Sequence, residues 1–421
     1  MQAVILLAGV SSRFYPFNSA HKSFVKIAGK PLIEHTLNSV KKSGLKEAIV
    51  VVKDDSARKF IENINPSLKL KFVIQKEATG MGEALLLAEK YIKEDFFLLH
   101  GHRLDFEILK KEIEKKKIRA DEIVLIAKKI QDRETLKKIG VLSVKGDKVL
   151  EIVEKPQKNI PSDLGVVGVY FLNRNFLTVL SNTPKGHYNF EEAVSLYAKK
   201  HGVKFVLSKE DNISFKYPWD ILLLKNYLLS NLNFYISKKA KVSSSAIIKG
   251  QVHIEDGVQI LENAVIKGPC FIGKNSYIGN NAVLRNGCDI EENCVVGANM
   301  EVKNTLIMEN SKTHSGFLGD SVIGKNCRIG AGFVSANVRI DRSTVKTVVD
   351  GKKLDTGFKS LGIMVGDGTK IGIKSSSMPG TIIGKEVIVG PSTNIMNNVG
   401  DSTKYYTKFS EIVIRKNERI R

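Results

Sequence analysis

Aliphatic side chains recur at every sixth residue along much of the second half of the chain. The positions of this series are Ile236, Val242, Ile248, Ile254, Ile260, Ile266, Ile272, Ile278, Leu284, Ile290, Val296, Val302 and Met308. A six-residue period fits neither an α-helix of about 3.6 residues per turn nor a strand with alternating faces. It is typical of a solenoid in which each flat face is one hexapeptide long and points one aliphatic side chain inward. The sequence therefore predicts a parallel β-helix with three faces to each coil.

The six-residue series is interrupted twice. It breaks after Met308 and returns shifted at Phe317, and it breaks again over about residues 339–359. Within the second break, Asp350-Gly351 lies between β-prone segments, which predicts a hairpin. Insertions into a solenoid tend to gather on one face, often the binding face. We therefore expect functional side chains in or beside these two breaks.

Short apolar runs alternate with amphipathic segments along the first 230 residues. Pro31 suits the first turn of a helix, and another helix is expected after Gly80-Met81-Gly82. Strands that alternate with helices predict an α/β domain with a mainly parallel sheet, whose ligands bind at the carboxyl ends of the strands. The expected strands cover residues 2–9, 48–52, 71–75 and 96–99.

The patterns divide the chain into three parts. Residues 1–232 are expected to form the α/β domain, which ends in a helical stretch from Trp219. Residues 233–400 are expected to form the β-helix, and residues 401–421 a polar, basic tail to which we assign no site.

Composition narrows the ligand classes. The chain has 421 residues and a formal net charge of +21. Such a charge can indicate nucleic-acid binding, but the lysines are dispersed and lack an interleaved aromatic platform. We therefore expect anionic small molecules and no nucleic acid. No apolar run reaches the length of a bilayer span, so we expect no membrane partner and a cytoplasmic location. Small buried thiols, rather than a disulfide or metal site, are predicted at Cys270, Cys288, Cys294 and Cys327.

Several short motifs follow one another in the order of a known enzyme family. Leu7-Ala8-Gly9, Glu154-Lys155-Pro156 and Tyr217-Pro218-Trp219-Asp220 lie in the first part, and the hexapeptide series fills the second. The chain resembles the bifunctional sugar-1-phosphate nucleotidylyltransferase/acetyltransferases, which include the N-acetylglucosamine-1-phosphate uridyltransferase/glucosamine-1-phosphate acetyltransferases and their archaeal relatives. The resemblance implies a Rossmann-like nucleotidyltransferase domain followed by a left-handed parallel β-helix. It also implies a homotrimer with acetyl sites between subunits.

The resemblance assigns the first part to phosphate and sugar recognition. A charged phosphoryl centre needs backbone N–H groups and fixed cations around it. The expected ligands are a nucleoside triphosphate or nucleotide sugar and a sugar-1-phosphate. The resemblance implies nucleotide or sugar binding at Ala8, Gly9, Arg13, Lys22, Gln75, Gly80, Gly82, Gly140, Glu154 and Gly168.

The chain departs from the family where the family binds Mg²⁺. His102 stands where the family has an aspartate, and Ser214 aligns with the second metal carboxylate. Neutral imidazole and hydroxyl groups are poor ligands for Mg²⁺, which prefers charged oxygen. Asp105 or Asp211 could replace them only if the backbone is shifted. We therefore assign no metal ligand and regard Mg²⁺ as doubtful, and this half either transfers nucleotides or is a degenerate binding domain or scaffold.

The resemblance assigns the second part to acyl transfer. Transfer from a thioester to an amine needs a base near the amine and a donor for the carbonyl oxyanion. The resemblance implies acetyl-CoA as the acyl donor. The implied catalytic residues are His314 and Asn337, and the implied phosphate-binding residues are Arg285, Lys303 and Lys346. Phe317 stands where the family has a tyrosine, so one hydroxyl near the amine is missing.

The leading hypothesis is a transferase of nucleotide-sugar biosynthesis that acetylates an amino-sugar-1-phosphate. Its first half would have weakened metal chemistry. One alternative is an active uridylyl- or thymidylyltransferase acting on a sugar-1-phosphate. The other is a non-catalytic scaffold that binds a sugar nucleotide.

Overall fold

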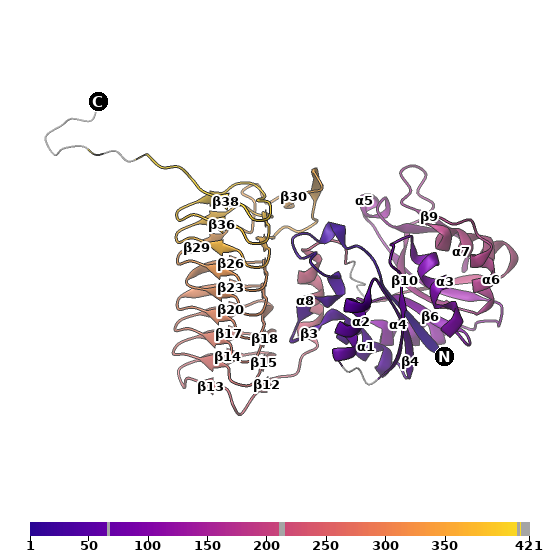
Figure 1. Cartoon of the computed structure of the whole chain (residues 1–421), viewed down its shortest axis with the longest axis horizontal. Coiled ribbons are helices and arrows are strands. Elements are labelled where there is room, and N and C mark those ends of the chain that lie inside the picture. The colour runs from indigo at the N-terminus through magenta and orange to yellow at the C-terminus, as the bar shows by residue number, and fades with distance from the viewer. Residues whose placement is uncertain (65–67, 210–214, 411–412, 414–421) are drawn as a thin grey trace. The chain divides into compact units, whose positions relative to one another are not determined.

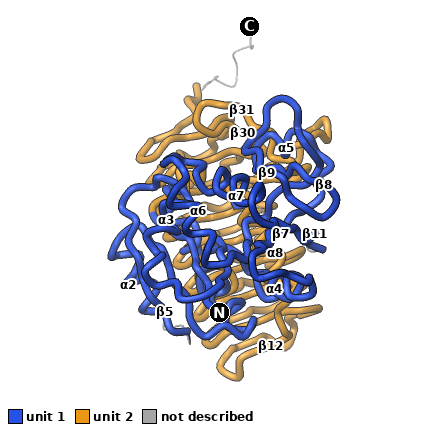
Figure 2. The backbone as a smooth tube through the Cα atoms, turned by 90° about the vertical axis from the view of Figure 1, so that its right-hand side faces the viewer, with its two compact units in different colours: residues 1–11, 20–25, 30–215 blue, residues 12–19, 26–29, 216–421 orange. Residues whose placement is uncertain are grey.

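The computed structural model describes residues 1–64, 68–209, 215–410 and 413 (Figure 1). Contacts between residues divide the chain into two compact units, drawn in different colours in Figure 2. Unit 1 comprises Met1–Ser11, Ala20–Val25 and Lys30–Phe215, and unit 2 comprises Ser12–Ser19, Lys26–Gly29 and Lys216–Arg421.

Unit 1 is built on a nine-stranded sheet in the order β5-β4-β1-β6-β10-β7-β11-β9-β8. Strands β5, β4, β1 and β6 run parallel, which confirms the predicted parallel sheet. Strand β10 is antiparallel to both β6 and β7. The strands are β1 (Gln2–Leu7), β4 (Glu47–Val52), β5 (Lys69–Ile74), β6 (Phe96–His100), β7 (Ile123–Lys129), β8 (Gly140–Lys145), β9 (Lys148–Glu154), β10 (Leu164–Leu172) and β11 (Val203–Leu207).

Helices cover both faces of this sheet. The strands are buried on both sides, so Val4 and Ile49 belong to one apolar cluster while Ile5 and Val50 belong to the other. Buried side chains of α3, α6 and α7 join the first cluster, and those of α1 and α4 join the second. The helices are α1 (Leu32–Lys42), α2 (Asp55–Asn63), α3 (Met81–Ala88), α4 (Phe106–Glu114), α5 (Arg133–Leu136), α6 (Asn175–Ser181) and α7 (Asn189–Lys200).

Most of unit 2 is a parallel β-helix whose three faces are three parallel sheets. Ile254 pairs with Ile272, and Ile272 pairs with Ile290, so one coil takes three hexapeptides. The inward aliphatic side chains form a continuous buried cluster along the coils. Figure 1 shows the stacked coils as a ladder of short strands. The hexapeptide series therefore predicted this fold.

The three sheets are named here by the order in which the chain enters them. The first face holds β12 (Tyr235–Ile236), β15 (Val252–Ile254), β18 (Cys270–Ile272), β21 (Cys288–Ile290), β24 (Leu306–Ile307), β27 (Val322–Ile323), β32 (Met364–Val365) and β35 (Ile382–Ile383). The second face holds β13 (Lys241–Val242), β16 (Gln259–Ile260), β19 (Tyr277–Ile278), β22 (Val295–Val296), β25 (Lys312–Thr313), β28 (Arg328–Ile329), β33 (Lys370–Ile371), β36 (Ile388–Val389) and β38 (Lys404–Tyr405). The third face holds β14 (Ile247–Lys249), β17 (Val265–Lys267), β20 (Val283–Arg285), β23 (Met300–Lys303), β26 (Gly316–Gly319), β29 (Phe333–Ser335), β34 (Ser376–Ser377) and β37 (Asn394–Ile395).

Asparagine makes many of the turns between faces. These residues adopt the left-handed conformation, with φ between 46° and 64°, which asparagine tolerates better than most residues that carry a Cβ. They are Asn263, Asn275, Asn281, Asn286, Asn293, Asn299, Asn304, Asn310 and Asn326. The free cysteines Cys270, Cys288, Cys294 and Cys327 are buried beside the aliphatic column, as predicted.

Two inward positions differ from the predicted series. Ile307 pairs with Ile290, so it takes the place expected for Met308. Leu318 pairs with Val302, so it takes the place expected for Phe317. Each of these hexapeptides is one residue short, which moves the inward position by one. Phe317 therefore faces outward, in register with Glu301.

The second break in the series forms the predicted hairpin. Strands β30 (Lys346–Val349) and β31 (Lys352–Asp355) pair antiparallel. Asp350 and Gly351 both have positive φ, at 49° and 72°, as the favoured two-residue hairpin turn requires.

Helix α8 (Asp220–Ser230) groups with the β-helix in unit 2. The boundary drawn at residue 232 falls after this helix and stays a prediction. Among the described residues, no helix combines the length and the apolar character needed to span a bilayer. The short elements are η1 (Ser12–Phe14), η2 (Lys22–Phe24), η3 (Glu89–Tyr91), β2 (Lys26–Ile27) and β3 (Lys30–Pro31).

Candidate functional site

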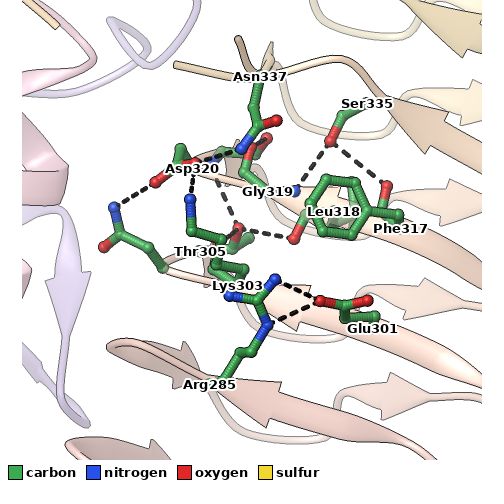
Figure 3. Close-up of polar contacts among 12 residues, drawn as sticks. Arg285, Glu301, Lys303, Thr305, Phe317, Leu318, Gly319, Asp320, Ser335 and Asn337 are labelled. Atoms are coloured by element: carbon green, nitrogen blue, oxygen red, sulfur yellow. Dashed lines mark hydrogen bonds and ion pairs between the residues drawn. The ribbon is translucent and has the colours of Figure 1, made fainter. Parts of the chain in front are cut away.

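The third face of the β-helix carries the arginine and the lysine that the sequence assigns to phosphate binding. Arg285 ends β20 and is in register with Lys303, which ends the neighbouring strand β23. The guanidinium of Arg285 donates to one carboxylate oxygen of Glu301, with 2.7 Å from Nε and 2.6 Å from Nη2 (Figure 3). The Arg285 side chain remains 33% exposed, so a ligand can reach it.

Asp320 organises the neighbouring polar groups. Its Oδ2 accepts hydrogen bonds from Lys303 Nζ at 2.9 Å and from Asn337 Nδ2 at 2.6 Å. Its Oδ1 accepts one from Asn304 Nδ2 at 2.8 Å. Figure 3 shows Lys303 and Asn337 converging on this carboxylate. Because the Asp320 side chain is only 5% exposed, three donors fix a nearly buried anion and are themselves fixed by it.

A glycine leaves the space for this cluster. A Cβ atom at Gly319 would lie 2.6 Å from the Phe317 ring and 2.8 Å from Nδ2 of Asn337. Side chains of other residue types would therefore displace Asn337 from Asp320. The structure places Arg285 and Lys303 in register on the third face and brings Asn337 to the same Asp320 carboxylate as Lys303. Their roles in binding and catalysis stay predictions.

His314 lies at a different place on the β-helix. It directly follows β25, and its backbone N–H donates to the carbonyl oxygen of Ile329 at 3.0 Å. It lines an open groove of about 520 Å³ whose other lining residues lie on, or directly follow, strands of the second face. Lys312, Arg328 and Lys370 occupy one register column along this groove. The groove therefore pairs one exposed imidazole with a row of cations.

Lys346 begins the hairpin strand β30 and is exposed. Its Cα partner across the hairpin is Asp355. Asn398 anchors the hairpin to the β-helix by donating from Nδ2 to the carbonyl oxygen of Val348 at 2.9 Å. The structure thus places Lys346 on a projecting arm rather than in the Asp320 cluster.

The carboxyl edge of the unit 1 sheet carries the residues assigned to the triphosphate. Ala8 and Gly9 follow β1, and a Cβ atom at Gly9 would lie 4.0 Å from Nε2 of His21. His21 Nδ1 accepts the N–H of Ser23 at 3.2 Å, so its Nε2 carries the proton when the ring is neutral. Burial and the charge of Lys22 lower the pKa of His21 to about 3. Lys22 Nζ donates to the carbonyl oxygen of Phe215.

A second group of assigned residues surrounds Glu154 at the end of β9. Gly140 is the Cα partner of Glu154, and a Cβ atom there would lie 2.8 Å from Oε2 of Glu154. Lys155 Nζ lies 3.5 Å from Oε1 of Glu154 and donates to the Tyr188 hydroxyl at 2.9 Å. Gly140 therefore provides room for the carboxylate that the sequence assigns to the sugar.

The loop before α3 is closely packed against the residues before α7. Gly80 has φ of 131°, and a Cβ atom there would lie 2.7 Å from the His187 carbonyl oxygen. A Cβ atom at Gly82 would lie 2.2 Å from Oδ1 of Asn189. Gln75 is 5% exposed and donates to the Gly80 carbonyl oxygen at 3.2 Å. Gln75 thus shapes the loop, and its contact with a base stays a prediction.

His100 and His102 lie at the end of β6, where the resemblance implies a metal carboxylate. His102 follows β6 and stacks on His100, with ring centroids 5.6 Å apart and planes at 11°. His100 also packs against Gly168, where a Cβ atom would lie 2.9 Å from the ring. Burial is the main cause that lowers the pKa of His102 well below its usual range, and the positive charge of Lys22 lowers it further. A neutral imidazole does not fit Mg²⁺.

The nearby carboxylate Asp105 is engaged within its own loop. Arg103 donates to it from Nε at 3.0 Å and from Nη2 at 2.8 Å. Ser214 and Asp211 lie outside the described residues, so their expected roles cannot be placed. Over the described ranges, no three His, Cys, Asp or Glu side chains are arranged to hold a metal ion, which leaves the Mg²⁺ expectation untested. Of the described residues at this edge, His102 is a poor ligand for Mg²⁺ and Asp105 is already engaged by Arg103.

Other residues of these sites were missed or left unplaced by sequence reasoning. Arg13 lies in η1 and belongs to unit 2 by its contacts, whereas Ala8 and Gly9 belong to unit 1. Asp320 and Asn304 were assigned no role. Their positive φ values of 50° and 46° show that both lie in turns. Aspartate and asparagine are common turn residues, so the sequence alone gives no indication of a role in the site.

Comparison with known proteins identifies the family. Residues 2–220, more than half of the chain, match the nucleotidyl transferase family, and residues 269–302 match the bacterial transferase hexapeptide family (six repeats). "Bifunctional protein GlmU" of Methanococcus maripaludis strain C7 is 36% identical and covers 99% of each chain. The protein of that name from Methanocaldococcus jannaschii is 32% identical over 99% of this chain and 100% of its own. A "bifunctional sugar-1-phosphate nucleotidylyltransferase/acetyltransferase" of Sulfurisphaera tokodaii is 33% identical over 95% of this chain and 98% of its own. The chain therefore belongs to the bifunctional sugar-1-phosphate nucleotidyltransferase/acetyltransferase family of transferases.

Proposed function

We propose that the β-helix is an acetyl-CoA-dependent N-acetyltransferase that acts on an amino-sugar-1-phosphate. The observation that carries this proposal is the pair of cations, Arg285 and Lys303, fixed in register on the third face. A sugar phosphate needs such fixed positive charge, and Arg is well suited to it because its planar guanidinium can bind two phosphate oxygens at once.

Each cation is already paired with a carboxylate, which bears on how the phosphate binds. Glu301 is 39% exposed, so it can turn into solvent when a phosphate takes its place on Arg285. Asp320 is nearly buried and holds three donors, so it stays in place and keeps Lys303 oriented. Arg285 is therefore assigned to direct phosphate contact, and Lys303 contributes a charge whose position is set by Asp320.

The reaction itself requires one proton transfer. The substrate amine attacks the thioester carbonyl carbon, the C–N bond forms and the C–S bond breaks, and the leaving thiolate of CoA takes up a proton. His314, which lies on another face of the same chain, is assigned to remove the amine proton at a site shared between subunits. Asn337 is assigned to contact the substrate through its amide, which donates to Asp320 in the structure. The cation row Lys312, Arg328 and Lys370 beside His314 suits a polyanionic acyl donor such as acetyl-CoA.

The nucleotidyltransferase half is proposed to bind a phosphate ligand. Its metal-dependent nucleotidyl transfer is proposed to be weak. The Sulfurisphaera tokodaii relative is named for both activities. In this chain His102 replaces the expected carboxylate, and Asp105 is held by Arg103. Lys22 and the Nε2–H of His21 beside Gly9 favour anion binding. The second candidate function of this half is therefore nucleotide or sugar-phosphate binding without transfer.

The test of the acyltransferase is CoA release with glucosamine-1-phosphate or galactosamine-1-phosphate as acceptor. Because a general base contributes about 10²–10⁴-fold, His314→Ala is expected to lower kcat by that factor while the fold is retained. Arg285→Ala is expected mainly to raise KM for the sugar phosphate, since a phosphate contact persists in ground and transition states. If the wild type releases no CoA with either amine, this function is wrong. If it turns over and His314→Ala is unimpaired, the base is another group.

A further inference from the structure

A lysine on α8 is completely buried against the β-helix within unit 2. Lys225 has 0% exposure. Its Nζ donates to three uncharged oxygens, namely the carbonyl oxygen of Gly287, Oδ1 of Asn226 at 2.9 Å and Oδ1 of Asn304 at 2.9 Å. Burying an ammonium group is costly unless its hydrogen bonds are satisfied. All three N–H groups of Lys225 can be satisfied in this pocket.

The backbone of the β-helix is shaped to receive this ammonium group. Gly287 has φ of 91°, and a Cβ atom there would lie 2.7 Å from Oδ1 of Asn226 and 3.4 Å from Nζ of Lys225. A glycine at this position is therefore needed both for the turn and for the space. Lys225 thus occupies a specific receptor rather than a chance gap between α8 and the coil.

One of the three oxygens leads directly to the candidate acyl-transfer site. Asn304 accepts from Lys225 through Oδ1 and donates through Nδ2 to Oδ1 of Asp320 at 2.8 Å. Asp320 in turn accepts from Lys303 and Asn337 at 2.9 and 2.6 Å. An asparagine amide has one acceptor end and one donor end. The ammonium group of Lys225 requires the acceptor end, so the donor end of Asn304 must face Asp320.

We propose that Lys225 is a positioning residue for the phosphate site of the acyltransferase, acting through Asn304 and Asp320. The proposal rests on the function proposed above for that site. Lys225 does not touch the substrate. It fixes the orientation of the Asn304 amide, which completes the set of three donors on Asp320, and Asp320 then holds the ammonium group of Lys303 and the amide of Asn337 in place.

Because Lys225 is titratable, the affinity of the site for a sugar phosphate is expected to depend on pH. Burial lowers the pKa of Lys225 to about 8, and the groups that act against this effect are Cys288, Asp289, Asp320 and Cys270. Below pH 8 the ammonium group is present and donates to Asn304. As pH rises through about 8 the charge is lost, and the hydrogen bond that orients Asn304 weakens. Affinity for a sugar phosphate is therefore expected to fall over this range.

The test is the dissociation constant of N-acetylglucosamine-1-phosphate, measured by calorimetry at pH 7 and pH 9. This ligand carries no amine, and its phosphate, whose second pKa is about 6, is already mostly dianionic at pH 7, so the small further ionisation by pH 9 would strengthen rather than weaken binding. Lys225→Met and Asn304→Ala are each expected to raise Kd about tenfold at pH 7, and the double variant no further than either single one. The matched control Asn226→Ala, which removes a Lys225 contact outside the relay, is expected to stay within about twofold of the wild type.

The pH comparison separates positioning from general structural damage. The wild type is expected to bind more weakly at pH 9 than at pH 7, and Lys225→Met is expected to show no such difference. A wild-type Kd in folded Asn304→Ala, which retains Lys225, overturns the relay even if Lys225→Met fails to fold. An effect of Asn226→Ala as large as that of Asn304→Ala also overturns it. A wild type that binds no sugar phosphate at either pH overturns the proposed acyl site itself, and with it this inference.

Discussion

At the scale of single residues, the candidate acyl site consists of cationic side chains that are oriented by ion pairs with carboxylates. The family motif marks the positions of Arg285 and Lys303, and their contact with a phosphate stays a prediction. Asp320 and Lys225, which hold them, could not be predicted from the sequence. Asp320 lies 17 positions from Lys303 in sequence and Lys225 lies 79 positions from Asn304, so only the coil register and the packing of α8 bring these groups together.

His102 stands where the family resemblance implies a metal carboxylate, and this leads to a prediction about metal-dependent chemistry. Pyrophosphate release from UTP or dTTP with a sugar-1-phosphate and Mg²⁺ is expected to be weak or absent in the wild type. Two carboxylates at the expected positions supply the charged oxygen that Mg²⁺ prefers. His102→Asp combined with Ser214→Asp is therefore expected to raise the rate, as measured by coupled pyrophosphate detection. Robust wild-type turnover with millimolar Mg²⁺ would show the metal argument to be wrong.

At the scale of elements, the hexapeptide period predicted the strands but not the register of two coils. At Ile307-Met308 and at Phe317-Leu318 two apolar residues are adjacent, so the pattern cannot decide which one points inward. Shortened hexapeptides decide it in the structure. The outward orientation of Phe317 places its ring near Asn337 and in register with Glu301.

Helix α7 carries a partly buried carboxylate, Glu191, whose protonation is expected to affect the stability of the fold. Burial, with the nearby charge of Glu154, raises the pKa of Glu191 to about 7, and Oε2 of Glu191 is buried without a hydrogen-bond partner among the described residues. Between about pH 4.5 and 7 the folded state therefore keeps a proton that the unfolded state has lost. Stability supplied by that proton is present at low pH and is lost as pH rises through 7.

Glu191→Gln removes this pH dependence while keeping the size of the side chain. At pH 8 the variant is expected to be more stable than the wild type by roughly 1–3 kcal/mol, which corresponds to a few degrees in Tm. Near pH 4.5 the two should differ little. Glu192→Gln at the neighbouring exposed position is the control and is expected to show no such trend in thermal melts. A Tm difference between Glu191→Gln and wild type that is the same at both pH values would contradict this assignment.

At the scale of the whole molecule, the fold class and the two-part organisation could be predicted because long repeats and ordered motifs extend over most of the chain. The assembly could be expected only from family resemblance. We predict a homotrimer at micromolar concentration. Exposed apolar side chains on or beside the third face, including Val334, Met378 and Met396, are suited to burial between β-helices. Light scattering should give the mass of three chains, and a clean monomer would count against a site shared between subunits.

The central proposal is that the acyltransferase half is active while the nucleotidyltransferase half has weakened metal chemistry. One product analysis tests both parts together. The wild type is incubated with glucosamine-1-phosphate, acetyl-CoA, UTP and Mg²⁺, and the sugar products are identified by mass spectrometry. The account predicts that N-acetylglucosamine-1-phosphate accumulates with little or no nucleotide sugar. Nucleotide sugar as the main product, or no acetylated sugar at all, would contradict it.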